Sequence, residues 1–332
     1  MLNSSWSASY KNLANKTDLR ECSVSERPFS EIIVDFRSRV FRYMRLIYTN
    51  RPLADKINSV FRAMKNIQSE RKRVFNGALI LIKKEVAMMK PKKCTYVLCS
   101  PVTCPFKERI KLVRAEMCTK RRDEFNQCVE VFKRDMLDAD ALQKCCAALE
   151  SYILSDVENI CMMYNKEEWL LGVEHYELPR KADYFESDRL CATLSAATPA
   201  YSGSAADKNP NFYEATSKHL FKRASSGAAA VLSEDFDCVV LFGADIMVKE
   251  VHKEFFSYIT REDVMNIFGS TCRKDMIHKS CLMGTHFNLG LKGVGPIKAK
   301  KLTGPAALKL FETCMAAQSM DKNKLYDFFG VN

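Results

Sequence analysis

Several features that would assign a class at once are missing from this sequence. No apolar run is long enough to span a membrane, since the best candidate, Gly77–Ile82, is far too short. The N-terminus lacks the basic-then-apolar order of a secretory signal peptide. The fourteen cysteines include no CxxC pair, so we expect no structural zinc site. We expect reduced, buried thiols, an intracellular and reducing compartment, and no membrane partner.

Acidic residues are outnumbered. The 332 residues include 51 Lys and Arg against 40 Asp and Glu, which gives a net charge of +11. A basic balance of this size suits a polyanionic partner such as nucleic acid. Apolar residues make up 47% of the chain, so a sizeable core is available. The length suffices for one large α/β domain, or for one domain with an insertion.

Short apolar runs that alternate with helical patterns predict an α/β fold with a mainly parallel sheet. The predicted strands are the start of Glu31–Val40, Thr95–Cys99, Ala228–Leu232 and Val239–Phe242. Helices are expected over about 41–74, over a basic segment at 107–135, in the stretch to about 165, and over most of the chain beyond 245. The active site of such a sheet lies at the carboxyl ends of its strands.

We divide the chain into four expected parts. They are an N-terminal extension (1–30), an α/β domain (31–245) with a basic segment (about 105–135) and an inserted polar loop (about 196–228), a helical subdomain (246–320) that contains segment 282–302, and a tail (321–332).

The segment 282–302 reads LMGTHFNLGLKGVGPIKAKKL. Gly293 and Gly295 permit a tight turn that presents backbone amides, and Pro296 suits the first position of a following helix. The free N–H groups of that helix would face a phosphate, with Lys298, Lys300 and Lys301 beside it. The pattern predicts a sequence-independent grip on a nucleic-acid backbone, and an ordinary tight turn between two helices is the alternative.

Two carboxylates follow a predicted buried strand directly. In Ser233-Glu234-Asp235-Phe236-Asp237, the side chains of Asp235 and Asp237 would face the same way if the chain stayed extended. A site of carboxylate oxygens suits Mg²⁺ or Mn²⁺. A solvated acidic loop is the alternative.

These segments together resemble the flap endonuclease / XPG-type family of structure-specific nucleases. The resemblance covers about 30–310. It is strong over 226–302, which includes VLSEDFDCVVLFGAD (Val231–Asp245) and segment 282–302, and weak before residue 180. It implies a central, mainly parallel sheet flanked by helices (PIN/flap-endonuclease-like) with a helix–two-turn–helix DNA-binding subdomain. It also implies two divalent ions, Mg²⁺ or Mn²⁺, and no organic cofactor.

The resemblance also implies which side chains hold the ions. The predicted metal ligands are Asp35, Glu186, Asp188, Asp235 and Asp237. Asp35 follows a buried strand, and its alternative role is to cap the next helix. Glu186 and Asp188 precede RLCATL, which matches the family's trailing pattern, whereas an alternative register at Lys181 and Asp183 loses that pattern. The pair can converge only in the first turn of a helix.

Lys107 and Arg114 open a basic segment that resembles the gateway helix of the family's arch. Their spacing of seven residues places them on one helix face. The resemblance implies that both contact the scissile phosphate. A solvated helix face is the alternative, and it is the usual environment of such residues.

Two positions depart from the family's pattern. Ser100 stands where the family has a metal-binding aspartate, and no acidic residue occurs between Glu85 and Glu108. His286 replaces the aspartate of the family's GxDY motif, and imidazole suits Mg²⁺ poorly. Glu234 and Asp183 are candidates to fill the gap. Such departures are typical of divergent members of the family, viral ones included.

The C-terminal segment Lys322–Phe329 is similar to the sliding-clamp-binding box that often ends flap endonucleases. Leu325, Phe328 and Phe329 would bind the clamp, and the alternative is a final helix turn that closes the core.

The expected function is metal-dependent, structure-specific cleavage of branched or flapped nucleic acid in DNA replication, repair or recombination. The expected location is the nucleus or a cytoplasmic site of viral replication. The alternative function is a catalytically weak or inactive member that serves as a DNA-binding or scaffold protein.

Overall fold

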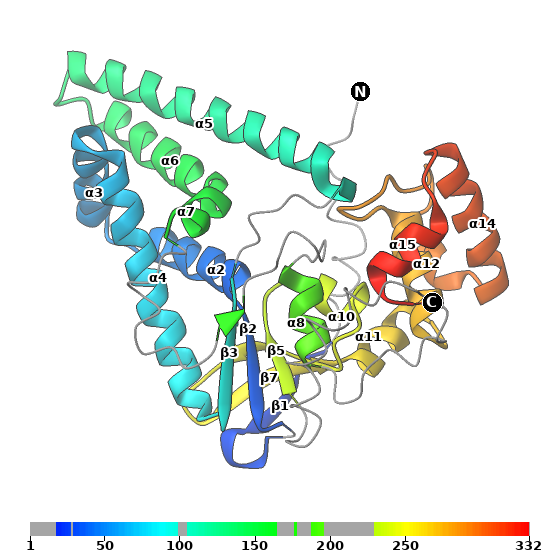
Figure 1. Ribbon diagram of the computed structural model, residues 1–332. Helices are drawn as coiled ribbons and strands as arrows, with labels where there is room; N and C mark the ends of the chain where they lie inside the picture. The colour runs from blue at the N-terminus through cyan, green and yellow to red at the C-terminus, as the bar shows by residue number, and fades with distance from the viewer. Residues whose placement is uncertain are drawn as a thin grey trace.

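A mixed α/β architecture is seen in the computed structural model (Figure 1). It describes residues 18–27, 29–98, 105–164, 176–177, 187–195 and 229–331. Glu186, Ser100, Asp183 and the expected loop at about 196–228 lie outside the described residues.

The described strands form one seven-stranded sheet in the order β1-β7-β6-β5-β2-β3-β4. Their bounds are β1 Arg20–Ser23, β2 Glu31–Asp35, β3 Lys93–Val97, β4 Tyr176–Glu177, β5 Ala229–Leu232, β6 Ile246–Val251 and β7 Phe255–Thr260. The run β6-β5-β2-β3-β4 is parallel, while β7 and β1 add an antiparallel edge. The predicted mainly parallel sheet is therefore confirmed.

Strand β2 is the centre of the parallel part and fixes where the carboxyl ends meet. Its last residue, Asp35, pairs with Val97 of β3, and Val34 pairs with Leu232 of β5. The residues that follow β2 and β5 therefore emerge side by side at one edge of the sheet.

Alternation along the central strands divides the interior into two cores. Ile33 and Val231 face one apolar cluster, while Ile32, Val34 and Leu232 face the other. Each strand is buried on both faces, which explains why its sequence is a continuous apolar run instead of an alternating one.

The helices of the first half of the chain are α2 Phe36–Thr49, α3 Leu53–Lys65, α4 Ile67–Met89, α5 Glu108–Arg134, α6 Ala139–Ser155 and α7 Val157–Tyr164. Helices α2 and α4 contact the sheet, while α3, α6 and α7 pack on these two helices. Helix formation starts directly after Asp35 and continues to Met89, beyond the expected limit at 74. The basic segment forms α5, a 27-residue helix about 40 Å long that packs along α6 (Figure 1).

The helices of the second half are α8 Ser187–Ser195, α10 Asp237–Val240, α11 Arg261–Phe268, α12 Arg273–Met283, α13 Pro296–Lys301, α14 Gly304–Ala317 and α15 Lys322–Phe329. Helices α8, α10 and α11 contact the strands, α12 packs on α10 and α11, and α13 and α14 pack on α12. The expected strand at Val239–Phe242 is wrong, because these residues form α10 and its C-terminal turn. A four-residue apolar run is buried equally well in either form. The sheet instead continues beyond residue 245 as β6 and β7.

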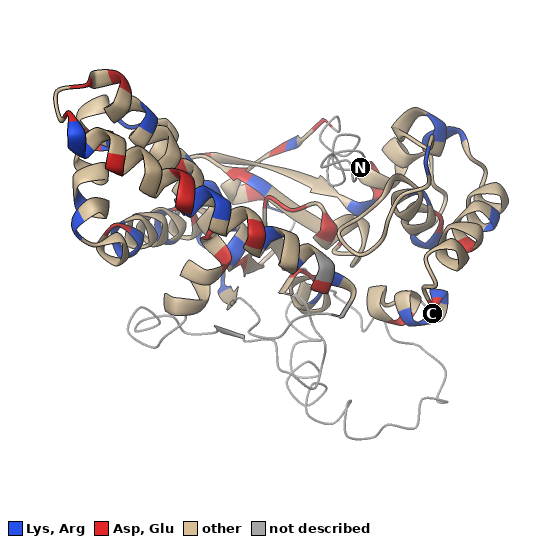
Figure 2. Ribbon diagram, turned by 90° about the horizontal axis from the view of Figure 1, so that it is seen from above, with Lys and Arg blue, Asp and Glu red and all other residues tan. Residues whose placement is uncertain are grey.

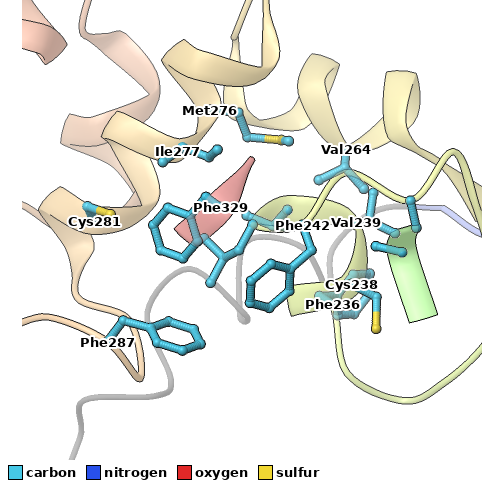
Figure 3. Packing of buried hydrophobic residues seen from close by; sticks show 14 of the residues in the cluster. Phe236, Cys238, Val239, Phe242, Val264, Met276, Ile277, Cys281, Phe287 and Phe329 are labelled. Atoms are coloured by element: carbon cyan, nitrogen blue, oxygen red, sulfur yellow. The ribbon is translucent and has the colours of Figure 1, made fainter. Parts of the chain in front are cut away.

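Helix α15 belongs to the core. Leu325, Phe328 and Phe329 are at most 5% exposed. The ring of Phe329 lies 5.8 Å from that of Phe242 and 5.5 Å from that of Phe287, in an aromatic group that Figure 3 shows in part. The alternative interpretation, a final helix turn that closes the core, therefore replaces clamp binding, because a clamp would have to extract these side chains.

Two further expectations concern the membrane and the cysteines. Among the described residues, no helix combines the length and apolar character that a membrane crossing requires. Every cysteine that the structure describes is a free thiol, and most are buried.

Candidate active site

Two groups of carboxylates meet at the carboxyl edge of the parallel strands. The first carboxylate group contains Asp35 at the end of β2 and Asp188 in the first turn of α8, with the thiol of Cys238 beside them. One ligand atom from each of the three lies within 4.8 Å of the others. Asp35 also caps α2, since its Oδ1 accepts a hydrogen bond from the N–H of Ser38 at 3.3 Å. The capping role and the predicted position in the site are thus compatible.

Burial makes this first group electrostatically unfavourable. Asp35 is 1% exposed and Asp188 is 2% exposed. Burial raises the pKa of Asp35, and the charge of Asp235 adds to the effect, although a hydrogen bond from Ser233 (Oγ to Oδ2, 2.7 Å) opposes it. Burial and the neighbouring Asp35 raise the pKa of Asp188 well above its usual range, with Lys107 opposing. Buried carboxyl groups with raised pKa values, close to one another, are typical of functional sites.

The second carboxylate group contains Asp235, Asp237 and His286, again with ligand atoms within 4.8 Å of one another. The two aspartates converge as predicted, but not as alternate residues of a strand. Strand β5 ends at Leu232, and the chain turns so that Asp235 Oδ1 accepts the N–H of Asp237 at 3.1 Å. The Nδ1 atom of His286 lies 3.4 Å from Oδ2 of Asp237.

A tightly packed loop after α12 holds His286 in place. Thr285 accepts the N–H of Phe287 at 3.0 Å, and its hydroxyl lies 2.7 Å from Oδ1 of Asn288. Gly290 is required by close approach, because a Cβ there would lie 2.6 Å from the backbone of Met283. The backbone on both sides of His286 is therefore fixed by the fold.

Lys107 lies at the first carboxylate group. It is 3% exposed, its Nζ lies 3.9 Å from Oδ2 of Asp188, and it also lies 4.7 Å from the ring centroid of Phe287. A buried lysine at this place offers a positive charge beside the carboxylates. It is not a solvated surface residue.

Arg114 lies on α5 and contacts a different acid. Its Nη1 lies 3.6 Å from Oε2 of Glu158 in α7, which Arg37 and Lys111 also approach, at 3.2 and 3.5 Å. Burial alone would raise the pKa of Glu158, but these cations hold it below its usual value. Through these ion pairs, Glu158 of α7 connects the first turns of α5 to α2 and α7.

Glu234 does not fill the gap left by Ser100. Its Oε1 accepts from Nη1 of the buried Arg39 at 2.7 Å and pairs with Arg42, and the carboxylate faces Lys249. Arg39 in turn pairs with the buried Glu85. Through these ion pairs, Glu234 connects the loop that carries Asp235 to α2, α4 and β6.

The hairpin Gly293–Pro296 projects from the same loop as His286. Gly293 has φ +83°, a conformation that favours glycine, and a Cβ built at Gly293 or Gly295 meets nothing within 4 Å. Lys298, Lys300 and Lys301 are exposed on α13. Figure 2 shows that cations are also spread along α5. The predicted turn therefore has open space where a phosphate backbone would approach.

Sequence reasoning missed four residues of the site. They are Ser233, Cys238, Glu158 and Phe287. Ser233 and Cys238 flank the predicted aspartates, so proximity alone could have suggested them. Glu158 and Phe287 carry no local signal, because only the tertiary fold brings them to α5.

No protein-family model and no curated protein matches the sequence. Solved structures do match, among them the catalytic core of Rad2 in complex with DNA substrate. Complex II has 13% identity and a TM-score of 0.42, covering 96% of this chain and 83% of that chain. The corresponding values are 14%, 0.43, 95% and 75% for complex III, and 13%, 0.38, 98% and 83% for the Rad2 core of complex I. This similarity concerns the fold and gives no support to a viral source.

Proposed function

We propose that the protein is a divalent-metal-dependent endonuclease that cuts branched or flapped nucleic acid. The observation that carries the proposal is the convergence of Asp35, Asp188, Asp235 and Asp237 at the carboxyl edge of a parallel sheet. The donor set fits divalent cations, since it consists mainly of carboxylate oxygens that repel one another in a buried place. Asp35 and Asp188 would hold one ion, and Asp235 and Asp237 a second. Glu186 stays a predicted ligand.

The ions would activate water and neutralise charge on the scissile phosphate. Lys107 supports the same chemistry from the protein side, because its ammonium group lies beside Asp188 and can stabilise charge that develops on phosphate oxygens. Arg114 would contact the substrate phosphates farther from the carboxylates than Lys107 does. Its position is set by the ion pair with Glu158.

Two features support a branched substrate. The hairpin and His286 belong to one loop, so a duplex held at Lys298 and Lys301 would lie next to the carboxylates. Helix α5 begins at Glu108, directly after Lys107, and extends away from the sheet edge, where a displaced strand would pass (Figure 1). Cations on both elements suit phosphate contacts that do not depend on sequence.

The test is to incubate the full chain with labelled 5′-flap, nicked and single-stranded substrates of DNA and of RNA. We expect cleavage of the flap with Mg²⁺ or Mn²⁺ and none with EDTA. Cleavage that persists in EDTA would contradict the proposal.

A catalytically weak or inactive nucleic-acid-binding protein is the second candidate. His286 favours it, because an imidazolium 3.4 Å from Asp237 could neutralise that carboxylate in place of an ion. Tight flap binding without cleavage at any metal concentration would select this candidate.

A further inference from the structure

The second carboxylate group is completed by an imidazole. His286 Nδ1 lies 3.4 Å from Oδ2 of Asp237, longer than the usual 2.7–3.2 Å of an N–H···O hydrogen bond. Two ligands that each lie about 2.0–2.2 Å from one ion are separated by about 3 Å or slightly more. Together with Asp235, the spacing therefore suits three ligands around a shared ion better than it suits a hydrogen bond.

The chemistry of this donor set is selective. Mg²⁺ strongly prefers oxygen ligands and keeps several waters, whereas first-row transition ions accept imidazole readily. The loop contributes as well, since Thr285, Asn288 and Gly290 fix the backbone that carries His286 before any ion arrives. A preorganised ligand loses little conformational entropy on binding.

We propose that Asp235, Asp237 and His286 form a site for a first-row transition-metal ion such as Mn²⁺, and that His286 makes this site select against Mg²⁺. The inference rests on the proposed function, because it concerns the same site. It predicts that the protein depends on Mn²⁺ where an all-carboxylate site would accept Mg²⁺.

The direct test is the electron spin-echo envelope modulation spectrum of the full chain loaded with Mn²⁺. A nitrogen modulation from a coordinated imidazole is expected in the wild type. It should be lost in His286→Ala and His286→Asn. The matched control is His252→Ala, because His252 also lies near a carboxylate, 3.7 Å from Glu250, but on the surface and outside the site. This control should keep the signal.

Competition measures the selectivity. Mn²⁺ bound to the wild type should resist displacement until Mg²⁺ is in about 100-fold excess, and His286→Asp should lower that ratio at least about tenfold, because a hard oxygen replaces the imidazole. A wild-type spectrum without nitrogen modulation would overturn the proposal even if a variant fails to fold. So would equal displacement in wild type and His286→Asp.

The two proposals fail in different ways. Nitrogen coordination of Mn²⁺ without cleavage of any substrate would refute the nuclease function and leave the metal site intact. Cleavage supported equally by Mg²⁺ and Mn²⁺, with no nitrogen signal, would refute the role of His286 and leave the nuclease function intact.

Discussion

The carboxyl edge of the sheet and the Gly293–Pro296 hairpin are joined by one loop, yet they are built in opposite ways. At the edge, Asp35 and Asp188 are buried in one group, and Asp35 accepts hydrogen bonds from Ser38 and Ser233. At the hairpin, the glycines face open space and the lysines are exposed. The first arrangement costs stability and suits chemistry, while the second costs little and suits binding. Substitutions in the two places should therefore change different measurements.

The largest effect is expected at the second carboxylate group. Asp235→Asn and Asp237→Asn should each reduce metal-dependent cleavage by about 10³-fold or more, because a catalytic ion contributes several kcal/mol and about 1.4 kcal/mol is tenfold in rate. Affinity for flapped DNA in EDTA should change less than about twofold. Single-turnover kinetics beside fluorescence anisotropy measure both. Equal activity of variants and wild type would place the chemistry elsewhere.

Lys107→Ala should slow cleavage by about 10²–10³-fold, the usual effect of removing one group that stabilises transition-state charge. Binding should weaken far less. Lys120→Ala is the matched control, since Lys120 lies on α5, the helix that follows Lys107, with its side chain 79% exposed. If both variants lose the same modest amount of activity, Lys107 acts only through the general charge of α5.

The hairpin should respond in affinity alone. Gly295→Val has room in the fold but would hold the backbone away from a phosphate, so we expect about tenfold weaker duplex binding, equivalent to one lost charge-assisted hydrogen bond. Lys298→Ala should lower the slope of log K against log salt by about 0.9. Lys133→Ala, at the far end of α5, is the control and should leave the slope unchanged. Wild-type binding by Gly295→Val across the salt series would mean that the hairpin is only a turn.

Stability provides the reverse comparison. Asp188→Asn replaces a buried carboxyl group, whose pKa is raised by burial, with a neutral amide. The variant should therefore melt at a higher temperature than wild type in EDTA. Each kcal/mol gained corresponds to about 1–2 °C in a chain of this length, because the entropy of unfolding is about 2.1 cal/mol/K per residue. Adding Mn²⁺ should reverse the order, because only the wild type gains the full binding energy. A lower melting temperature for Asp188→Asn in EDTA would contradict the electrostatic cost described for the edge.

A smaller effect should appear among the C-terminal helices. Burial lowers the pKa of His278 to about 4, and its Nε2 lies 2.6 Å from the hydroxyl of Tyr326. The unfolded chain therefore binds a proton that the folded protein excludes between about pH 6.5 and pH 4, and stability is lost as pH falls through this range. His278→Gln should show a shallower fall in melting temperature over the same range. Parallel curves for the two proteins would contradict this assignment.

Sequence patterns predicted the elements whose formation depends on neighbouring residues in the chain. The apolar runs of β2 and β5 and the basic periodicity of α5 are local, and all three elements occur within a few residues of the expected bounds. Val239–Phe242 was misassigned because its burial does not distinguish a strand from a helical turn. The convergence of Asp235 and Asp237 was expected for an extended chain, whereas a side chain–backbone hydrogen bond in a turn produces it. Glu158 and Phe287 depend on contacts between distant elements, which no local pattern records.

Strand β2 is synthesised early but has neighbours on both sides that come later, and one of them, β5, follows by nearly 200 residues. At about 5–20 residues per second, the ribosome needs some tens of seconds at the slower rates to supply that partner. Until then Asp35 has no acidic neighbours from Asp235 or Asp237, and one edge of β2 stays open. Parallel pairing over such a separation is also intrinsically slow, since the loop must close before the contacts form. The carboxylates therefore meet only after the segment that carries Asp237 has been made, and a nascent chain that stops before residue 286 carries an incomplete site.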